Sequence, residues 1–336
     1  MDERLKVNFM RKITIKDIAK LSGVSFKTVS RVINNEKNVK DTTRERVEKL
    51  LKEFNFSVNY NAKRLASNSL KQIAIITNTE DNELNKNYII MNYILKYGKK
   101  RDYTILVYKS MKELIRNNFG KIDAGFYEGV IFLNPKKMDE VQRVCDDNIP
   151  VVVSGISDKY IYVGTDQFES AYLATKSLVN KKCRDIGIVL GDPETRTNIE
   201  KVKGYKQALR DSNIRINTKN IMYNYETSHQ VENLITKFYL KNELFQALII
   251  GSDILALGAV RAVNKLGIKC PEKFKFISFG NTYICTETYP TISSIKQNFE
   301  EIARQLVDKI INIIENDSRE TSFKISAEII ERESTI

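Results

Sequence analysis

Three side chains near the N-terminus have the chemistry and the spacing to contact base edges in DNA. Arg31 can donate paired hydrogen bonds to guanine O6 and N7, Lys27 can donate to the same atoms as a point charge, and Phe26 can contact a thymine methyl group. Other polar side chains nearby suit phosphate oxygens, which fix the register of a protein on the duplex: Thr14, Ser25, Thr28, Ser30, Asn34 and Asn38.

The spacing of small and branched residues predicts the element that presents these side chains. With Ile15 as position one, Ala19 falls at position five, Gly23 at nine and Val29 at fifteen. A small residue at five lets two helices approach, glycine at nine allows a tight turn, and a branched residue at fifteen fills the space between them. This pattern is typical of a helix-turn-helix, whose second helix enters the major groove. A generic three-helix bundle is the alternative.

Capping signals predict where the helices of this segment begin. Thr14 and Asp17 have the spacing of a capping box, Ser25 can cap a second helix, and residues 42–45 (Thr-Thr-Arg-Glu) have the form of another capping box. The expected apolar positions are Ile15, Ile18, Ala19 and Leu21, then Val29, Val32 and Ile33, then Val47, Leu50, Leu51 and Phe54.

The positive charge of the chain is concentrated in the same segment. The 336 residues contain 54 Lys and Arg against 42 Asp and Glu, a net charge of +12. Residues 1–70 hold 16 of the basic and 8 of the acidic residues, so the first fifth of the chain carries +8 and the remaining 266 residues carry +4. This asymmetry indicates a polyanion-binding head on a nearly neutral body.

Several other classes of protein are excluded. No apolar run approaches the length of a membrane span, and the N-terminus lacks the apolar region of a secretory signal. The motifs GxGxxG (after the first expected strand), GxxxxGKS/T, HExxH and GxSxG are absent, and His229 is the only histidine. We therefore expect no catalytic site, metal or cofactor, and a cytoplasmic protein with reduced thiols at Cys145, Cys183, Cys270 and Cys285.

From residue 72 onward, short apolar runs alternate with amphipathic helical stretches, which predicts parallel α/β sheets covered on both faces. About eight strands in two series indicate two doubly wound subdomains with a cleft between them. The expected strands are residues 73–77, 103–108, 129–133, 150–154, 185–190, 246–250, 274–279 and 325–330, and the expected helices include 88–97, 168–179, 201–211, 228–239 and 255–266.

Open α/β sheets bind ligands at the carboxyl ends of their strands. The polar residues at the expected strand ends are therefore candidates for a small-molecule site. They are Asn78, Thr79, Asn134, Ser154, Asp192, Arg196, Ser252, Asp253, Asn281 and Gln297.

The residues from Thr14 to Asn34, with the stretches at 43–47 and 61–66, resemble the DNA-binding signature of the LacI/GalR transcriptional repressors. The resemblance implies that residues 61–66 form a hinge helix, in which Ala62 and Lys63 contact DNA and Leu65 is inserted between base pairs of the minor groove. It also implies a DNA contact from Ile15.

The resemblance extends to the body and implies an architecture like that of periplasmic sugar-binding proteins, with crossings near residues 164–166, 295–297 and 318–322. The implied domains are a mobile arm (1–11), a helix-turn-helix domain (12–58), a hinge helix and linker (59–70) and an effector-binding body (71–336). Within the body, the N-subdomain spans about 71–163 plus 297–318, and the C-subdomain spans about 164–294 plus 322–336.

Individual positions of the body match the family or depart from it. Tyr225 matches an aromatic that stacks on the effector, Lys201 stands at the position of an effector-anchoring arginine, and Asn281 and Gln297 match directly. Gly155 and Gly280 stand where acidic residues are frequent. The sequence around Ser278–Thr282 resembles the trehalose-operon repressors of the family, which sense a sugar phosphate. Loss of two acceptors with retention of Lys201 and Arg196 favours an anionic effector.

Two further expectations concern assembly and switching. A pseudo-palindromic operator is read by a two-fold dimer, and the helix at residues 88–97 carries more apolar surface (Ile89, Ile90, Ile94, Leu95) than one face can bury. In the family this helix lies in the dimer interface. We thus expect a homodimeric repressor of a carbohydrate operon, switched by a small sugar or sugar phosphate. The alternatives are an α/β enzyme, or a regulator that docks a phosphocarrier protein, with an appended helix-turn-helix.

Overall fold

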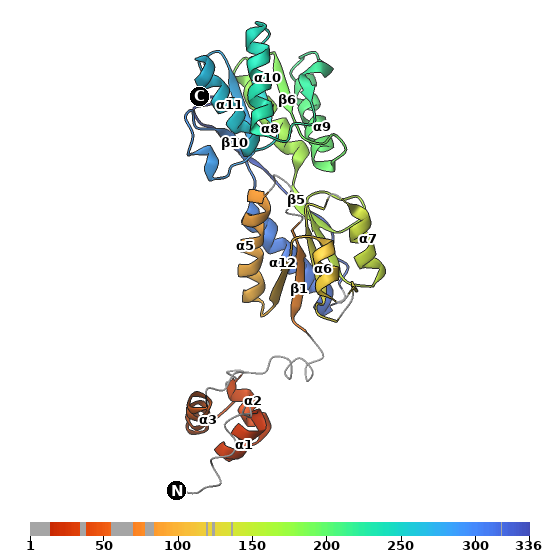
Figure 1. Cartoon of the computed structure of the whole chain (residues 1–336), viewed down its shortest axis with the longest axis vertical. Helices are drawn as coiled ribbons and strands as arrows, with labels where there is room; N and C mark the ends of the chain where they lie inside the picture. The colour runs from red at the N-terminus through yellow and green to blue at the C-terminus, as the bar shows by residue number, and fades with distance from the viewer. Residues whose placement is uncertain are drawn as a thin grey trace. The chain divides into compact units, whose positions relative to one another are not determined.

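The computed structural model describes residues 14–33, 38–54, 70–77, 84–118, 120–122, 125–135, 137–316 and 318–336. The chain divides into two compact units, Met1–Leu70 and Lys71–Ile336. We call them the head and the body (Figure 1). Among the described residues, no helix combines the length and the apolar character that crossing a membrane requires.

The head contains three helices, α1 (Ile15–Ser22), α2 (Phe26–Ile33) and α3 (Asp41–Glu53). Their apolar faces meet in one small core, because residues spaced by three or four positions lie on the same side of a helix. The buried members of this core come from all three helices: Ile18, Ala19, Val29, Val32 and Val47. The predicted three-helix head is confirmed.

The first sheet of the body is parallel throughout and has the strand order β11-β5-β4-β3-β1-β2. Its strands are short runs of branched and aromatic residues, which suit a sheet that is covered on both faces. They are β1 (Gln72–Ile76), β2 (Thr104–Tyr108), β3 (Gly129–Leu133), β4 (Val151–Ser154), β5 (Tyr162–Thr165) and β11 (Phe323–Ile325).

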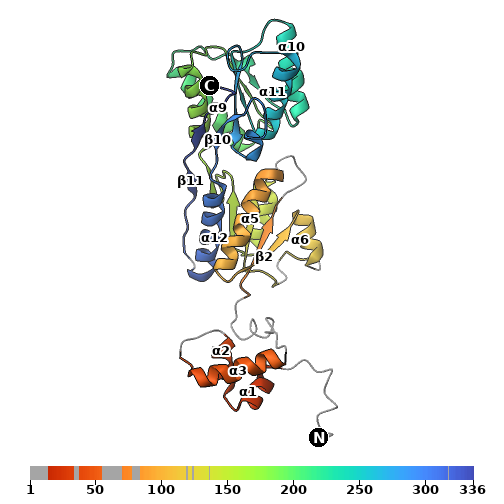
Figure 2. The same ribbon diagram turned by 90° about the vertical axis from the view of Figure 1, so that its left-hand side faces the viewer.

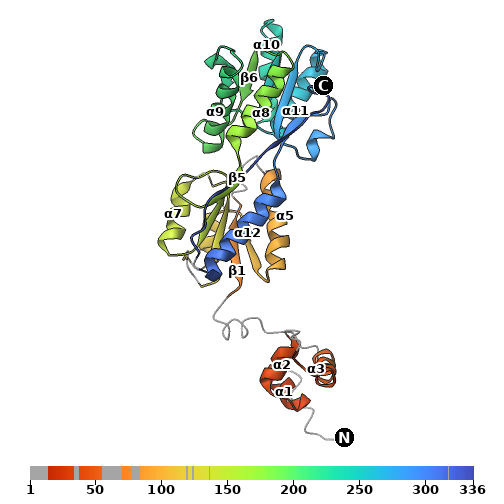
Figure 3. The ribbon, with the colours of Figure 1, turned by 180° about the vertical axis from the view of Figure 1, so that it is seen from behind.

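Helices cover both faces of this sheet. Alternate residues of β1 point to opposite faces of the sheet. On one face, Ile73 and Ile75 pack in a cluster with α5 (Leu84–Lys100) and α12 (Phe299–Asn316). These two helices lie side by side (Figures 2 and 3). Ala74 and Ile76 pack in another cluster, with α6 (Met111–Asn117) and α7 (Met138–Asp146).

The second sheet has the order β12-β10-β9-β8-β6-β7, and only its edge strand β12 is antiparallel to its neighbour. Its strands are β6 (Ile186–Val189), β7 (Ile221–Met222), β8 (Ala247–Ile250), β9 (Lys275–Gly280), β10 (Ser293–Lys296) and β12 (Glu328–Ile330).

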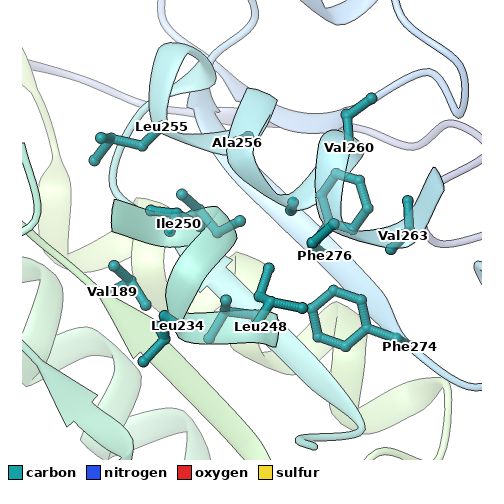
Figure 4. Close-up of a cluster of buried hydrophobic side chains, with 14 of the residues drawn as sticks. Val189, Leu234, Leu248, Ile250, Leu255, Ala256, Val260, Val263, Phe274 and Phe276 are labelled. Atoms are coloured by element: carbon teal, nitrogen blue, oxygen red, sulfur yellow. The ribbon is translucent and has the colours of Figure 1, made fainter. Parts of the chain in front are cut away.

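This sheet also lies between two helical layers. One face packs against α8 (Gln167–Asn180) and α9 (Arg196–Arg210), and the other against α10 (Ser228–Leu240) and α11 (Asp253–Leu266). Figure 4 shows the side chains of Leu248 and Ile250 of β8 packed against side chains of α10 and α11, on the second of these two faces. Short 3-10 turns at Thr218–Asn220 and Tyr283–Cys285 complete the described elements.

The described chain passes between the two sheets at three places. These are Asp166, between β5 and α8; residues 297–298, between β10 and α12; and residues 326–327, between β11 and β12. The expected position of the third crossing, residues 318–322, is wrong. Residues Phe323–Ile325 still pair with β5 in the first sheet, so the chain crosses only after them. The expected single strand at 325–330 is correspondingly two strands in different sheets, and β5, β7 and β10 were not predicted.

Candidate functional site

The turn between α1 and α2 depends on Gly23. Its backbone adopts the left-handed conformation at φ +69°, and its N–H donates to the carbonyl of Ala19. No heavy atom lies within 4 Å of the position that a Cβ would take, so the backbone angle rather than the space favours glycine. A side chain in this conformation costs about 1–2 kcal/mol. The predicted role of Gly23 in the turn is confirmed.

Hydrogen bonds at the helix starts test the predicted caps. Thr14 and Asp17 form the expected capping box, with Thr14 N donating to Asp17 Oδ2 at 2.8 Å and Asp17 N donating to Thr14 Oγ1 at 3.3 Å. Ser25 Oγ accepts from the N–H of Thr28 at 3.1 Å. The capping box expected at residues 42–45 is wrong, because α3 begins at Asp41, after Lys40, and has no side-chain cap.

The apolar stripe of α1 also differs from the expectation at one position. Leu21 is 54% exposed, whereas Ser22 is buried and donates through Oγ to the carbonyl of Ile18 at 2.6 Å. Ser22 lies four residues after Ile18 and therefore on the same face. Phe54, expected in the stripe of the third helix, follows α3 and is 42% exposed.

The first turn of α2 presents the proposed base-reading side chains to solvent. Phe26 is 51% exposed, although it lies only three residues before the buried Val29 and therefore flanks the buried face. Lys27 is exposed on the side of the helix away from Val29 and Val32. Arg31 is half-buried and lies four residues after Lys27, one turn along the same side.

The remaining expected DNA contacts are distributed around this helix. Thr14 and Ser25 are exposed, Thr28 and Ser30 are half-buried, Asn38 is exposed, and Ile15 packs against the core of the head. Four expected contacts lie outside the described residues: Asn34, Ala62, Lys63 and Leu65.

Polar residues expected to bind an effector follow neighbouring strands of the second sheet. Asp192 comes after β6, Ser252 after β8, Asn281 after β9 and Gln297 after β10. Because β10, β9, β8 and β6 are adjacent and parallel, their carboxyl ends meet at one edge of the sheet. Asn78 and Thr79 lie outside the described residues. Asn134 follows β3 and Ser154 ends β4, so both lie at the first sheet.

Lys201 brings a positive charge to the same edge. This residue of α9 is buried, and its Nζ donates to the carbonyl of Gly251, directly after β8, at 3.1 Å. The ammonium also lies 4.1 Å from the centre of the Phe279 ring of β9, a cation–π distance. Lys201 thus lies at the same sheet edge as the other candidate residues.

Asp253, expected to bind the effector, instead connects elements of the protein interior. It is 2% exposed, and its Oδ1 accepts from Ser278 and, at 2.9 Å, from Ser294 Oγ. Its Oδ2 accepts from the N–H and the hydroxyl of Thr282 at 2.8 and 2.9 Å. These four donors use the carboxylate, so we do not retain Asp253 among the effector residues.

The position of Asp253 also explains a departure from the family pattern. Gly280 stands where an acidic residue is frequent, with φ at +137°. A Cβ on Gly280 would lie 2.6 Å from Asp253 Oδ2, closer than real atoms approach. Any side chain at this position would displace the carboxylate that joins β9, β10 and α11.

Asn281 is held by a residue from the C-terminal segment. Its Oδ1 accepts from Arg332 Nη2 at 2.7 Å, and its N–H donates to Ser294 Oγ at 3.0 Å. The other guanidinium branch of Arg332 donates to the carbonyl of Ile292 at 2.8 Å. Sequence reasoning missed Arg332, because no local pattern connects positions 281 and 332.

The two remaining expected effector residues have different surroundings. Arg196, at the start of α9, forms an ion pair with Asp158, which lies between β4 and β5. Tyr225 is half-buried against the core shown in Figure 4, and burial raises the pKa of its hydroxyl above the usual value. Sequence reasoning also missed Asp158.

The described residues contain no group of His, Cys, Asp and Glu side chains that could hold a metal ion. All four cysteines are free thiols. His229 is exposed at the start of α10, and its ring nitrogens lie 3.2 Å from Asn233 Nδ2 and 3.8 Å from Glu232 Oε2. These contacts are those of a surface helix.

Two family models match the chain. Residues 14–59 match the bacterial regulatory proteins of the lacI family, and residues 175–335 match a periplasmic binding protein-like domain. The chain is also 31% identical, over 96% of its length and 99% of the relative, to the HTH-type transcriptional regulator MalR of Clostridium butyricum. The chain belongs to the LacI family.

Solved structures of LacI-type regulators share the fold. The lac repressor dimer bound to operator and the anti-inducer ONPF superposes with a TM-score of 0.81 at 19% identity, covering 97% of this chain and 100% of that one. The complex of the transcriptional regulator CelR with cellobiose gives a TM-score of 0.70 at 21% identity, covering 96% and 99%. These structures show the shared fold. The lacI-family match of the head and the 31% identity to a transcriptional regulator show that this chain is a DNA-binding transcription regulator and not an enzyme.

Proposed function

We propose that this LacI-family regulator is a homodimeric repressor of a carbohydrate-utilisation operon. It binds a pseudo-palindromic operator, and a small sugar or sugar phosphate bound between the two sheets of the body switches its affinity. A repressor has to reach the chromosome, so the proposal places the protein in the cytoplasm. The observation that carries the proposal is the exposed first turn of α2 on a helix-turn-helix core.

The polarity of this turn supports sequence-specific binding. Lys27 lies on the side of α2 away from Val29 and Val32, and Arg31 follows it one turn later on the same side. Phe26 is exposed between this side and the buried face. An arginine can distinguish guanine by two parallel hydrogen bonds, and each such pair discriminates by about 1–3 kcal/mol. Thr14, Ser25, Thr28, Ser30 and Asn38 lie around this face as candidates for phosphate contacts.

The edge of the second sheet supports a polar effector. Ser252 and Gln297 supply hydrogen-bonding groups, Lys201 supplies a buried cation and Tyr225 an aromatic ring. A sugar needs donors and acceptors together with an apolar face for its ring. Lys201 and Arg196 favour a phosphorylated sugar over a neutral one. An effector that prefers one arrangement of the two halves shifts the population toward it.

The proposed dimer uses the outer side of α5. Ile90 and Ile94 are buried within the body, so they are not available to a partner subunit. Tyr88 and Leu95 of the same helix are 47% and 38% exposed. The lac repressor, whose fold this chain shares, is a dimer on its operator. Light scattering should give the mass of a dimer at micromolar concentration, and a monomer with undiminished operator affinity would contradict this part of the proposal.

The experiment that tests the whole proposal starts from a random-sequence DNA library. Selection with the full chain should enrich one pseudo-palindromic sequence, because two identical heads read two half-sites about one helical turn apart. Failure to enrich any sequence would refute operator binding. Neutral sugars and sugar phosphates are then compared by the shift that each causes in thermal unfolding. A large shift with neutral sugars alone would refute the anionic effector.

A further inference from the structure

Three neighbouring strands of the first sheet end side by side at its carboxyl edge. The strands β1, β3 and β4 are parallel neighbours, and the residues that follow them are Thr77, Asn134 and Gly155. This edge faces the second half of the body, because Asp158, a few residues after β4, pairs with Arg196 of α9. A ligand bound between the two sheets therefore meets the groups at this edge.

An asparagine of α5 links two of these strand ends. Asn87 is 3% exposed, and its Nδ2 donates to the carbonyl of Thr77 at 2.9 Å. Its Oδ1 accepts from Asn134 Nδ2 at 2.6 Å. Both polar atoms of the buried amide thus have partners within the protein.

The backbone carbonyl of Thr77 determines the orientation of both amides. A carbonyl oxygen can only accept, so Asn87 has to turn its NH2 group toward Thr77 and its oxygen toward Asn134. An amide oxygen also only accepts, so the NH2 group of Asn134 has to face Asn87. The oxygen of Asn134 is thereby turned away from Asn87.

The oxygen of Asn134 is open to a ligand. Asn134 is half-buried, and its Oδ1 accepts no hydrogen bond from any residue in the described part of the chain. This oxygen is not one of the buried side-chain atoms that lack a partner among those residues, so solvent reaches it. Its orientation is already fixed by folding, and a ligand therefore binds it without the cost of ordering a free side chain.

Gly155 leaves room for this oxygen. Its backbone has φ at +111°, and a Cβ on this residue would lie 3.3 Å from Asn134 Oδ1. An acidic side chain is frequent at this position in the family, but here a carboxylate would crowd and repel the oxygen of Asn134. The edge thus carries a neutral acceptor, which does not repel an anionic group of the effector as a carboxylate would.

We propose that Asn87 is a positioning residue of the effector site, and that the amide oxygen of Asn134 accepts from a hydroxyl group of the effector. This inference rests on the proposed function and narrows its ligand. Asn134 offers an acceptor and no donor to the ligand, so it selects a sugar or sugar phosphate with a free hydroxyl at this point over one with an ether or a fluorine there. Asn87 acts only through Asn134, because its own polar atoms are already bonded.

Fluorinated sugars test this selection, because fluorine is close to a hydroxyl in size but cannot donate a hydrogen bond. Glucose, maltose, trehalose and their 6-phosphates are first compared by the shift that each causes in thermal unfolding of the full chain. The hydroxyls of the tightest binder are then replaced by fluorine one at a time. At the position that contacts Asn134, the unchanged protein should bind the fluorinated probe on the order of tenfold more weakly, because the donor is lost.

Two variants separate positioning from packing. Asn87→Leu keeps the size of the buried side chain but releases the amide of Asn134, whose NH2 group can then turn toward the fluorine. The penalty at that position should fall to about threefold or less, a change in selectivity that a loss of stability alone would not cause. Asn134→Ala should weaken binding of the unmodified probe, and fluorination at that position should then have no further effect, because both changes remove the same hydrogen bond.

Asn264→Leu is the matched control. It removes a hydrogen bond of the same kind, from Nδ2 to the carbonyl of Tyr289 at 2.8 Å, near the end of α11, and should keep the full fluorine penalty. An unchanged penalty at every position in Asn87→Leu would overturn the role of Asn87. Undiminished affinity in Asn134→Ala would overturn the contact, even if Asn87→Leu did not fold. If no sugar or sugar phosphate shifted the unfolding of the unchanged protein, the proposed effector site itself would fail instead.

Discussion

The guanidinium of Arg196 on α9 is paired with the carboxylate of Asp158, which lies between β4 and β5. Arg196 belongs to an element packed on the second sheet, and Asp158 follows a strand of the first sheet. The pair therefore connects the two halves of the body at one of the residues proposed to bind the effector. An anionic effector and Asp158 would compete for the same guanidinium.

Neutralising Asp158 should change the affinity for charged effectors only. In Asp158→Asn we expect sugar phosphates to bind severalfold more tightly, because Arg196 no longer has an internal anionic partner, and neutral sugars to bind as before. Thermal-shift titrations measure both. Asp139→Asn, at an exposed acid in the first turn of α7, is the matched control. Unchanged affinity for sugar phosphates would mean that Arg196 does not contact them.

Removing the guanidinium of Arg31 should relax specificity at one base pair of each half-site. Arg31→Ala is expected to cost about 1–3 kcal/mol on the selected operator and less on a variant operator that lacks the guanine. Fluorescence anisotropy with single-substituted duplexes measures the difference. A loss of affinity that is equal for all duplexes would show that Arg31 contacts phosphate and not a base.

Replacing Gly23 should weaken the head without affecting the body. Gly23→Ala places a side chain at φ +69° and should destabilise the head by about 1–2 kcal/mol, whereas Gly23→Asn should cost less, since asparagine tolerates this conformation. Hydrogen exchange of α1 and α2 amides in the full chain reports the local stability. Equal exchange in both variants and the unchanged protein would contradict the importance of the turn.

Truncation of Asp253 should destabilise the body strongly. Asp253→Ala leaves the hydroxyls of Ser278, Ser294 and Thr282 without their acceptor in a buried site, and we expect a loss of at least about 3 kcal/mol. The adjacent Ser252→Ala removes only the cap of α11 and should cost about 1 kcal/mol. Chemical denaturation compares the two. Similar losses would mean that the network around Asp253 contributes little.

The buried thiol of Cys285 should make stability fall at high pH. Burial raises the pKa of Cys285 to about 12, whereas a thiol in the unfolded chain titrates near 8.5. Above about pH 9 the unfolded state loses its proton first, so unfolding becomes more favourable as the pH rises. The thermal midpoint should decline between pH 9 and 11, and Cys285→Ala should reduce the decline. An identical pH profile in the variant would assign the decline to other groups.

The three described helices of the head could be predicted almost completely because their signals are local. Ala19, Gly23 and Val29 lie within 15 residues, and each acts on a neighbour in the same two helices. The errors there concern single positions. Leu21 is apolar but does not lie on the buried face of α1. Helix α3 begins at Asp41, before the threonines at residues 42 and 43 that were expected to cap it.

The body was less predictable where burial depends on distant partners. β10 was missed because Ser293 and Ser294 are polar, yet both are buried: Ser294 donates to Asp253, and Ser293 bonds to Thr335 and to the backbone of Arg332. These partners are about 40 residues away in the sequence, so no local pattern marks the strand. β7 has only two residues, too few for any periodicity.

One short stretch, residues 323–330, completes both sheets of the body. β11 joins the first sheet beside β5, and β12 joins the second beside β10. During synthesis, both halves therefore keep an open sheet edge until the same few residues have left the ribosome. Translation that stops before residue 323 would leave two unfinished edges exposed to proteases and to other chains. The head is therefore synthesised first, and both sheets of the body are completed only when β11 and β12 have been made.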